Sequence, residues 1–161
     1  YNCHAQSFKL ELVSDSLAHI ILQTDSMEDV WRLPYPVYRF QTGDINGDGT
    51  DETIVGVVKT TRFDPREGRR MFIFHNHKGR IRPLWMGTRL GQDIVDFVIA
   101  DGRIRAIEQN KRGQLAVNEY VYDAFGPTFH RRIAINISQE EAQVFLLNSP
   151  KQDQYQTTTK P

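Results

Sequence analysis

The sequence predicts an all-β domain of antiparallel meandering, propeller-blade-like sheets, followed by a short C-terminal helix. Three observations support this fold class. Short apolar runs recur at intervals of about 8–14 residues with turn residues between them, as in β-sandwiches and β-meanders. Two of those turns carry the Lys78-Gly79 and Asp101-Gly102 dipeptides, and Asp-Gly is a strong hairpin signal. Only one segment with clear helix signals is present, near the end of the chain.

The expected strands differ in pattern. Residues 8–12 alternate apolar and polar side chains, as in a half-buried strand. Residues 53–58 are β-branched and apolar, which predicts a buried strand. Residues 72–85 and 104–120 share a strand–turn–strand pattern, which fits either two related blades or two ordinary hairpins. In order, the expected strands cover residues 8–12, 17–22, 35–40, 53–58, 71–75, 80–85, 94–100, 103–108, 114–122 and 128–135.

The helix is predicted from a capping box, in which Ser138 and Glu141 each accept a hydrogen bond from the other's backbone N–H. Ala142, Phe145 and Leu146 then follow at helical spacing. Residues 26–31 form the other, shorter helical candidate.

The 161 residues suit one domain, which we place at 8–148. Residues 149–161 lack apolar side chains to bury, so we expect a polar, disordered tail. The formal net charge is zero, so we expect no binding to nucleic acid. No apolar run reaches the roughly 20 residues that span a bilayer, so we expect no transmembrane segment.

Residues 1–7 are interpreted separately. Cys3 and Ala5 have the small-residue spacing that signal peptidases recognise, with Gln6 as the mature start. The alternatives are a lipidated Cys3 and an ordinary frayed terminus. As Cys3 is the single cysteine, no internal disulfide is expected.

The most informative stretch is the loop at residues 44–52. Oxygen-bearing side chains fall at alternate positions, and Gly49 follows at the sixth position, where such a loop must turn sharply. Ca²⁺ takes six to eight oxygen ligands, which alternate side chains on a tightly wrapped loop can supply. The predicted ligands are Asp44, Asn46, Asp48, the carbonyl of Thr50, and Glu52. Asp51 is expected to point away from the ion.

The loop is not an EF-hand, because position twelve is Val55 instead of a bidentate Glu and a strand follows instead of a helix. The alternative is an acidic surface turn without metal, since Asn-Gly and Asp-Gly form turns unaided. Three carboxylates on one short loop would then repel each other, which favours a bound cation.

Asp44, Asn46, Asp48, Gly49 and Glu52, with the apolar strand after them, resemble the calcium loops of FG-GAP and VCBS-type repeats. This resemblance covers about 15 residues. It implies a propeller-blade element of an exported adhesion or carbohydrate-associated protein. Those proteins carry several copies of the loop, whereas this chain has one clear copy.

Other signals favour structural roles. The pair His75 and His77 has no third ligand at metal-site spacing. The arginine-rich segment 62–82 is interrupted by acidic residues, which favours a solvated strand face. Aromatic side chains on strands are more often core than sugar-binding platforms.

No nucleophile elbow or phosphate-binding loop is present, so no catalytic residue is assigned. We expect a calcium-stabilised binding, adhesion or accessory module that is secreted, periplasmic or on the cell surface, with a glycan or protein ligand. The alternative is a hydrolase using carboxylates such as Asp93, Asp96 or Glu108. It requires two of them roughly 5–10 Å apart in a cleft.

Overall fold

The computed structural model describes residues 5–60, 62, 65–87 and 89–148. Strands account for 66% of the structure and helix for 6%, which confirms the all-β class with a short C-terminal helix. The predictions for Cys3 and for the tail at 149–161 lie outside the described residues.

Three antiparallel sheets follow one another along the chain, each built from consecutive strands. The first has order β1-β2-β3, the second β4-β5-β6-β7 and the third β8-β9-β10-β11. The elements are β1 (Gln6–Ser14), β2 (Leu17–Thr24), β3 (Glu28–Leu33), β4 (Val37–Gly43), β5 (Glu52–Lys59), β6 (Gly68–His77), β7 (Arg80–Gly87), β8 (Asp93–Ala100), β9 (Arg103–Gln109), β10 (Leu115–Asp123), β11 (Gly126–Ile137) and α1 (Gln139–Leu147).

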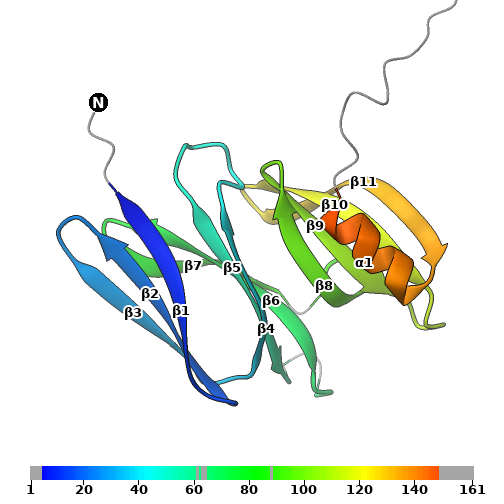
Figure 1. The fold of residues 1–161 in the computed structure, drawn as a ribbon, viewed down its shortest axis with the longest axis horizontal. Coiled ribbons are helices and arrows are strands. Elements are labelled where there is room, and N and C mark those ends of the chain that lie inside the picture. The colour runs from blue at the N-terminus through cyan, green and yellow to red at the C-terminus, as the bar shows by residue number, and fades with distance from the viewer. Residues whose placement is uncertain (1–4, 61, 63–64, 88, 149–161) are drawn as a thin grey trace, which may run out of the picture.

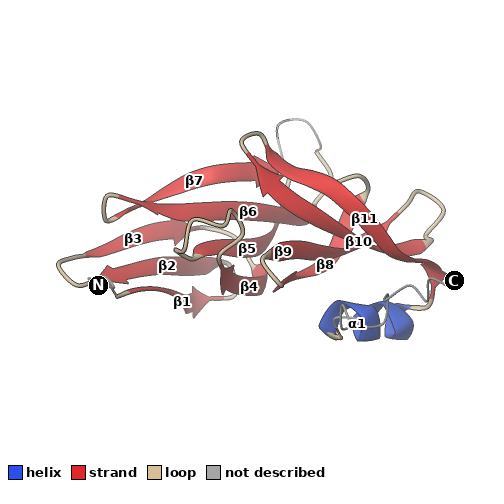
Figure 2. Ribbon diagram, turned by 90° about the horizontal axis from the view of Figure 1, so that it is seen from above, coloured by secondary structure: helices blue, strands red, loops and turns tan. Residues whose placement is uncertain are grey.

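The sheets stack side by side in chain order, and α1 covers the far face of the third sheet (Figure 1). The leading strands β1, β4 and β8 lie along one side of the stack, while β7 and β11 lie along the other (Figure 2). The arrangement therefore resembles adjacent propeller blades. The described residues contain no helix with the length and apolar character needed to cross a bilayer.

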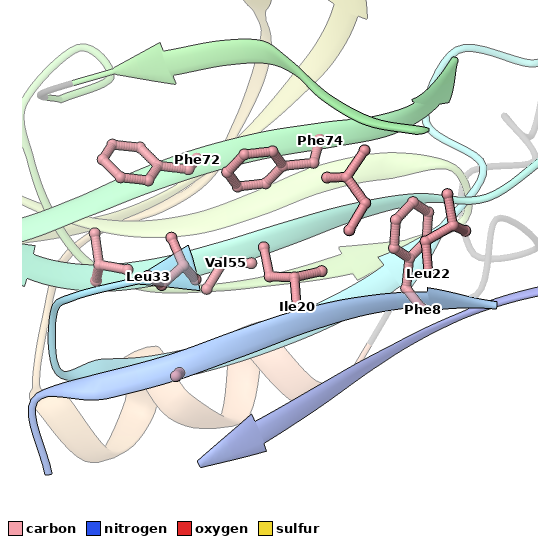
Figure 3. Packing of buried hydrophobic residues seen from close by; sticks show 10 residues of the cluster. Phe8, Ile20, Leu22, Leu33, Val55, Phe72 and Phe74 are labelled. Carbon is pink, nitrogen blue, oxygen red and sulfur yellow. The ribbon is translucent and has the colours of Figure 1, made fainter. Parts of the chain in front are cut away.

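The first core lies between the first and second sheets (Figure 3). Ile20 and Leu22 of β2 face Phe72 and Phe74 of β6 there, and Trp31 of β3 packs on Phe74 at a ring distance of 5.2 Å. The opposite face of the second sheet forms another core with the third sheet. Alternate residues of β5 contribute to the two cores, so this strand is buried on both faces. The buried strand predicted from its composition is confirmed.

A third cluster holds α1 against the third sheet. Ala142 and Leu146 of the helix pack on Ile107 and Val117. The capping box is confirmed, with Ser138 accepting from the Glu141 N–H and Glu141 accepting from the Ser138 N–H.

The helical prediction for residues 26–31 is wrong, because Glu28–Leu33 forms strand β3. Residues 28–33 pair with β2, and alternate side chains turn toward the first core, with Leu33 1% exposed. The similar strand–turn–strand patterns of residues 72–85 and 104–120 do not mark equivalent parts of two blades. Residues 72–85 span the third and fourth strands of one sheet, whereas residues 104–120 span the second and third strands of the next.

Candidate metal-binding loop

Residues 44–51 connect β4 to β5 at one end of the second sheet. Gly43 and Glu52, the last paired residues of this hairpin, flank the loop. Gly47 and Gly49 adopt left-handed backbone conformations, with φ of 76° and 85°. Side chains with a Cβ rarely adopt this conformation. The two glycines therefore let the loop reverse direction over a few residues and keep its polar side chains close together.

Side-chain oxygens of the loop accept hydrogen bonds from its own backbone. The Asp44 carboxylate accepts from the N–H groups of Gly47 and Gly49, each at 2.8 Å. Oδ1 of Asn46 accepts from the Asp48 N–H at 3.1 Å. Oδ1 of Asp48 accepts from the backbone N–H of Thr50 at 2.9 Å and from its hydroxyl at 2.8 Å. These bonds wrap the loop around its acidic side chains.

Three carboxylates converge in this loop. Oxygens of Asp44, Asp48 and Glu52 lie within 4.8 Å of one another. Asp48 is exposed, whereas Glu52 is 1% exposed. Burial, and to a lesser extent the charges of Asp48 and Asp44, raise the pKa of Glu52 to about 7. A hydrogen bond that Glu52 Oε2 accepts from the Ile45 N–H at 2.9 Å opposes this shift. The group is therefore arranged so that ionisation is unfavourable without a cation.

The loop is anchored to all three sheets. Ile45 is 3% exposed and packs in the core between the second and third sheets. A Cβ at Gly102, in the β8–β9 turn, would lie 3.2 Å from the Asp44 carbonyl oxygen, so that turn approaches the loop closely. On the other side, Gln6 of β1 donates to the Asp51 carbonyl at 2.8 Å and accepts from Asn76 at 2.9 Å.

Each predicted ligand lies in or next to this loop, and three of them form the carboxylate group. Asn46 Oδ1 and the Thr50 hydroxyl take part in the hydrogen bonds within the loop. Asp51 is exposed and lies outside the carboxylate group.

Two neighbours of the loop were not anticipated from the sequence. In β5–β6 pairing, Thr53 lies opposite Phe74, so the next pair in register would bring His75 of β6 beside Glu52. Burial lowers the pKa of His75, as does His77, while the Asp48 charge opposes this shift. The pKa of Tyr122 is raised by burial and, more weakly, by Asp123 and Glu52. Only the sheet register and the stacking of sheets bring these residues to the loop.

Comparisons with known proteins do not assign a family. No protein-family model matches the chain, and no curated protein or solved structure is significantly similar to it.

Of the carboxylates considered for hydrolysis, Asp96 and Glu108 lie on opposite faces of the third sheet. Asp96 lies opposite Ile107, which packs beneath α1, and Glu108 is the next residue along β9 and points the other way. Asp96 is held by Arg39 of β4 through bonds of 2.8 and 2.5 Å. Asp93 is exposed.

Glu108 is enclosed in a hydrogen-bond network. It accepts from the Asn118 side chain at 2.6 Å, from the Tyr120 hydroxyl at 2.7 Å and from the Gln92 N–H at 2.7 Å. These bonds connect the third sheet to the segment before β8, so Glu108 has a structural role.

Most of the aromatic side chains belong to the cores. Among the described residues, the most exposed aromatic side chains are on the β10–β11 hairpin, where Phe125 is 94% and Phe129 54% exposed. The Asp123 carboxylate accepts from the Phe125 N–H at 2.8 Å and from the Thr128 hydroxyl at 2.5 Å. The hairpin end is therefore built by specific hydrogen bonds and still leaves an aromatic ring in solvent.

Two arginines of the arginine-rich segment, Arg69 and Arg70, contact neighbouring groups of the protein. Arg70 is 3% exposed and donates to the carbonyls of Lys59 and Arg66. The Arg69 guanidinium lies over the Tyr38 ring, 4.5 Å from its centroid. Arg69 and Arg70 therefore act in packing, whereas the acidic interruptions had favoured a solvated strand face for this segment.

Proposed function

We propose that this chain is a calcium-stabilised binding or adhesion module that acts outside the cytoplasm, as a secreted, periplasmic or cell-surface protein. The observation that carries the proposal is the convergence of Asp44, Asp48 and Glu52, the last of them buried. A buried carboxylate beside two others is strongly favoured in its charged form only when a cation is present.

Calcium fits this donor set better than other common ions. The three carboxylates, the Asn46 amide oxygen and the Thr50 carbonyl are all oxygen donors, which hard cations prefer. The loop is an irregular turn whose oxygens come from successive residues. Ca²⁺ accepts such variable geometry, whereas Mg²⁺ demands a near-ideal octahedron and retains its waters.

The acidic loop also supports a location outside the cytoplasm. Calcium sites in extracellular modules commonly work with dissociation constants of about 10⁻⁴–10⁻³ M. A short loop with partly exposed ligands is suited to that range. The resemblance to FG-GAP and VCBS-type loops is consistent with the same location.

The ion would have a structural role. It would close the β4–β5 hairpin and fix Ile45 in the core between two sheets, so that the loop and its neighbours form a defined surface. The exposed ring of Phe125 on the β10–β11 hairpin supports recognition of a glycan or a protein by this module, since exposed aromatic rings are common anchors in both.

The metal site is tested by titrating calcium into EDTA-treated protein during thermal unfolding. A ligand that binds only the native state raises the midpoint with its concentration, because at a hundredfold excess over the dissociation constant it adds about 2.7 kcal/mol to the free energy of unfolding. Asp48→Ala should abolish this shift. Asp51→Ala is the matched control, because Asp51 is exposed and outside the carboxylate group. A midpoint that does not respond to calcium would refute the metal site.

The binding role is tested separately with glycan arrays and pull-downs from surface extracts, using the calcium-loaded protein. Binding should weaken in Phe125→Ser, which leaves the Asp123 hydrogen bonds to the backbone and to Thr128 in place. If neither assay detects a ligand, the binding role is contradicted and a purely accessory, structural role remains.

A further inference from the structure

The loop contains an Asn46-Gly47 dipeptide, and both residues are exposed. We propose that Asn46 is a site of spontaneous deamidation, in which the protein converts one of its own loop amides to a carboxylate. Attack by a backbone amide is easiest when the following residue is glycine, because no side chain shields that amide. At Gly47 the space is open as well, since a Cβ there would meet no atom within 4 Å.

The reaction needs only water as a second reactant. The Gly47 nitrogen attacks Cγ of Asn46, and the new N–Cγ bond forms as the amide loses its proton. The Cγ–Nδ2 bond then breaks, and ammonia leaves with that proton. Water opens the resulting five-membered imide at either carbonyl. One opening gives an ordinary aspartyl linkage and the other an isoaspartyl linkage, with no change in oxidation state.

Two hydrogen bonds of the loop favour the slow step. The Gly47 N–H, which must lose its proton, donates to Oδ1 of Asp44 at 2.8 Å. A carboxylate at this distance is within reach to accept the proton. Asn46 Oδ1, on which negative charge develops, accepts from the Asp48 N–H at 3.1 Å. A donor in that place stabilises the tetrahedral intermediate, as an oxyanion hole does.

The consequence for the metal site rests on the proposed function. The aspartyl product places a fourth carboxylate at the loop's third position, beside Asp44 and Asp48, and increases the attraction for a cation. The isoaspartyl product inserts an additional carbon into the backbone between residues 46 and 47, which changes the spacing of the ligands. Ageing would therefore divide the protein into a form with tighter calcium binding and a form with weaker binding.

The test is peptide mapping by mass spectrometry after incubation of the intact, metal-free protein in mildly alkaline buffer. Asn110 is the internal control, because its Oδ1 also accepts from the N–H two residues on, that of Arg112, at 3.0 Å, but the following residue is Lys111. Residue 46 should deamidate measurably faster than residue 110, because glycine leaves the attacking amide unshielded. Equal rates at the two positions would overturn the proposal.

The variant Asp44→Asn keeps an oxygen that accepts from Gly47 but lacks the basic carboxylate. It should slow deamidation at Asn46 severalfold without changing the rate at Asn110, with folding checked by circular dichroism. An unchanged rate at Asn46 in the folded variant would remove Asp44 from the reaction and contradict the mechanism.

A parallel incubation with calcium separates this inference from the metal site. Calcium held by Asp44 and Asn46 should restrain the side chain and slow the reaction. Rapid deamidation that is insensitive to calcium would leave the modification in place and overturn the calcium proposal instead.

Discussion

The metal-free protein should lose stability as the pH rises from 4.5 to 7, and Glu52 is the expected cause. Burial and the neighbouring carboxylates raise the pKa of Glu52 from 4.5 to about 7. Between these values the native state retains a proton that the unfolded chain has released. Linkage then requires the free energy of unfolding to fall with increasing pH in this window.

The magnitude follows from the pKa difference. At about 1.4 kcal/mol per pKa unit, a shift from 4.5 to about 7 corresponds to roughly 3 kcal/mol. For a domain of this size the loss would lower the thermal midpoint by roughly 6–12 °C. His75 acts in the opposite direction, because its pKa is lowered from 6.5 by burial, so its contribution to stability is lost as the pH falls.

The assay is thermal unfolding in EDTA at several pH values between 4.5 and 7.5, on the wild type and on Glu52→Gln. The amide cannot ionise but retains an oxygen that can accept from the Ile45 N–H. The difference between the two proteins isolates Glu52 from His75. Parallel pH profiles for wild type and Glu52→Gln would refute the reasoning.

Three further predictions concern the framework. Arg39→Ala leaves the Asp96 side chain, which is 5% exposed, without its bidentate partner and should cost about 3 kcal/mol in urea unfolding, partly restored by adding Asp96→Asn. Glu119 is buried, yet hydrogen bonds from two arginines hold its pKa at about 2 against a usual 4.5. The free energy of unfolding of the wild type should therefore fall by roughly 3 kcal/mol as the pH falls from 4.5 to 2. The same fall in pH should cost Glu119→Gln less. Leu146→Ala should lower the free energy of unfolding by about 3 kcal/mol, because Leu146 packs α1 against the third sheet. The helix should then detach locally, so amide exchange should rise in α1 before it rises in the sheets. An equal rise in exchange throughout the protein would contradict this local detachment.

Local sequence signals predicted most of the elements because they depend on neighbouring residues. The Lys78-Gly79 and Asp101-Gly102 turns have left-handed residues that close tight hairpins, as expected from their composition. The capping box places the start of α1 for the same reason. Residues 26–31 were misinterpreted because pairing with β2, which is a non-local contact, decides their conformation.

The candidate site was only partly accessible to this reasoning. The spacing of Asp44, Asp48 and Glu52 within one loop predicted that their oxygens converge. The sequence contains no signal that places His75 or Tyr122 near them, because their positions depend on strand register and on how two sheets pack. For the same reason the opposite orientations of Asp96 and Glu108 became visible only in the assembled sheet.

The order of the sheets has a consequence for how the chain acquires its fold. Each sheet closes through consecutive hairpins, so its strands meet over short stretches of chain and the entropic cost of each closure is small. The larger separations are bridged only when one completed sheet docks on the next. During synthesis the first sheet is therefore complete before the second emerges, and its apolar face can serve as the surface on which β5 and β6 assemble. An all-β protein organised in this way avoids much of the long-range pairing that makes β-sandwiches slow to fold.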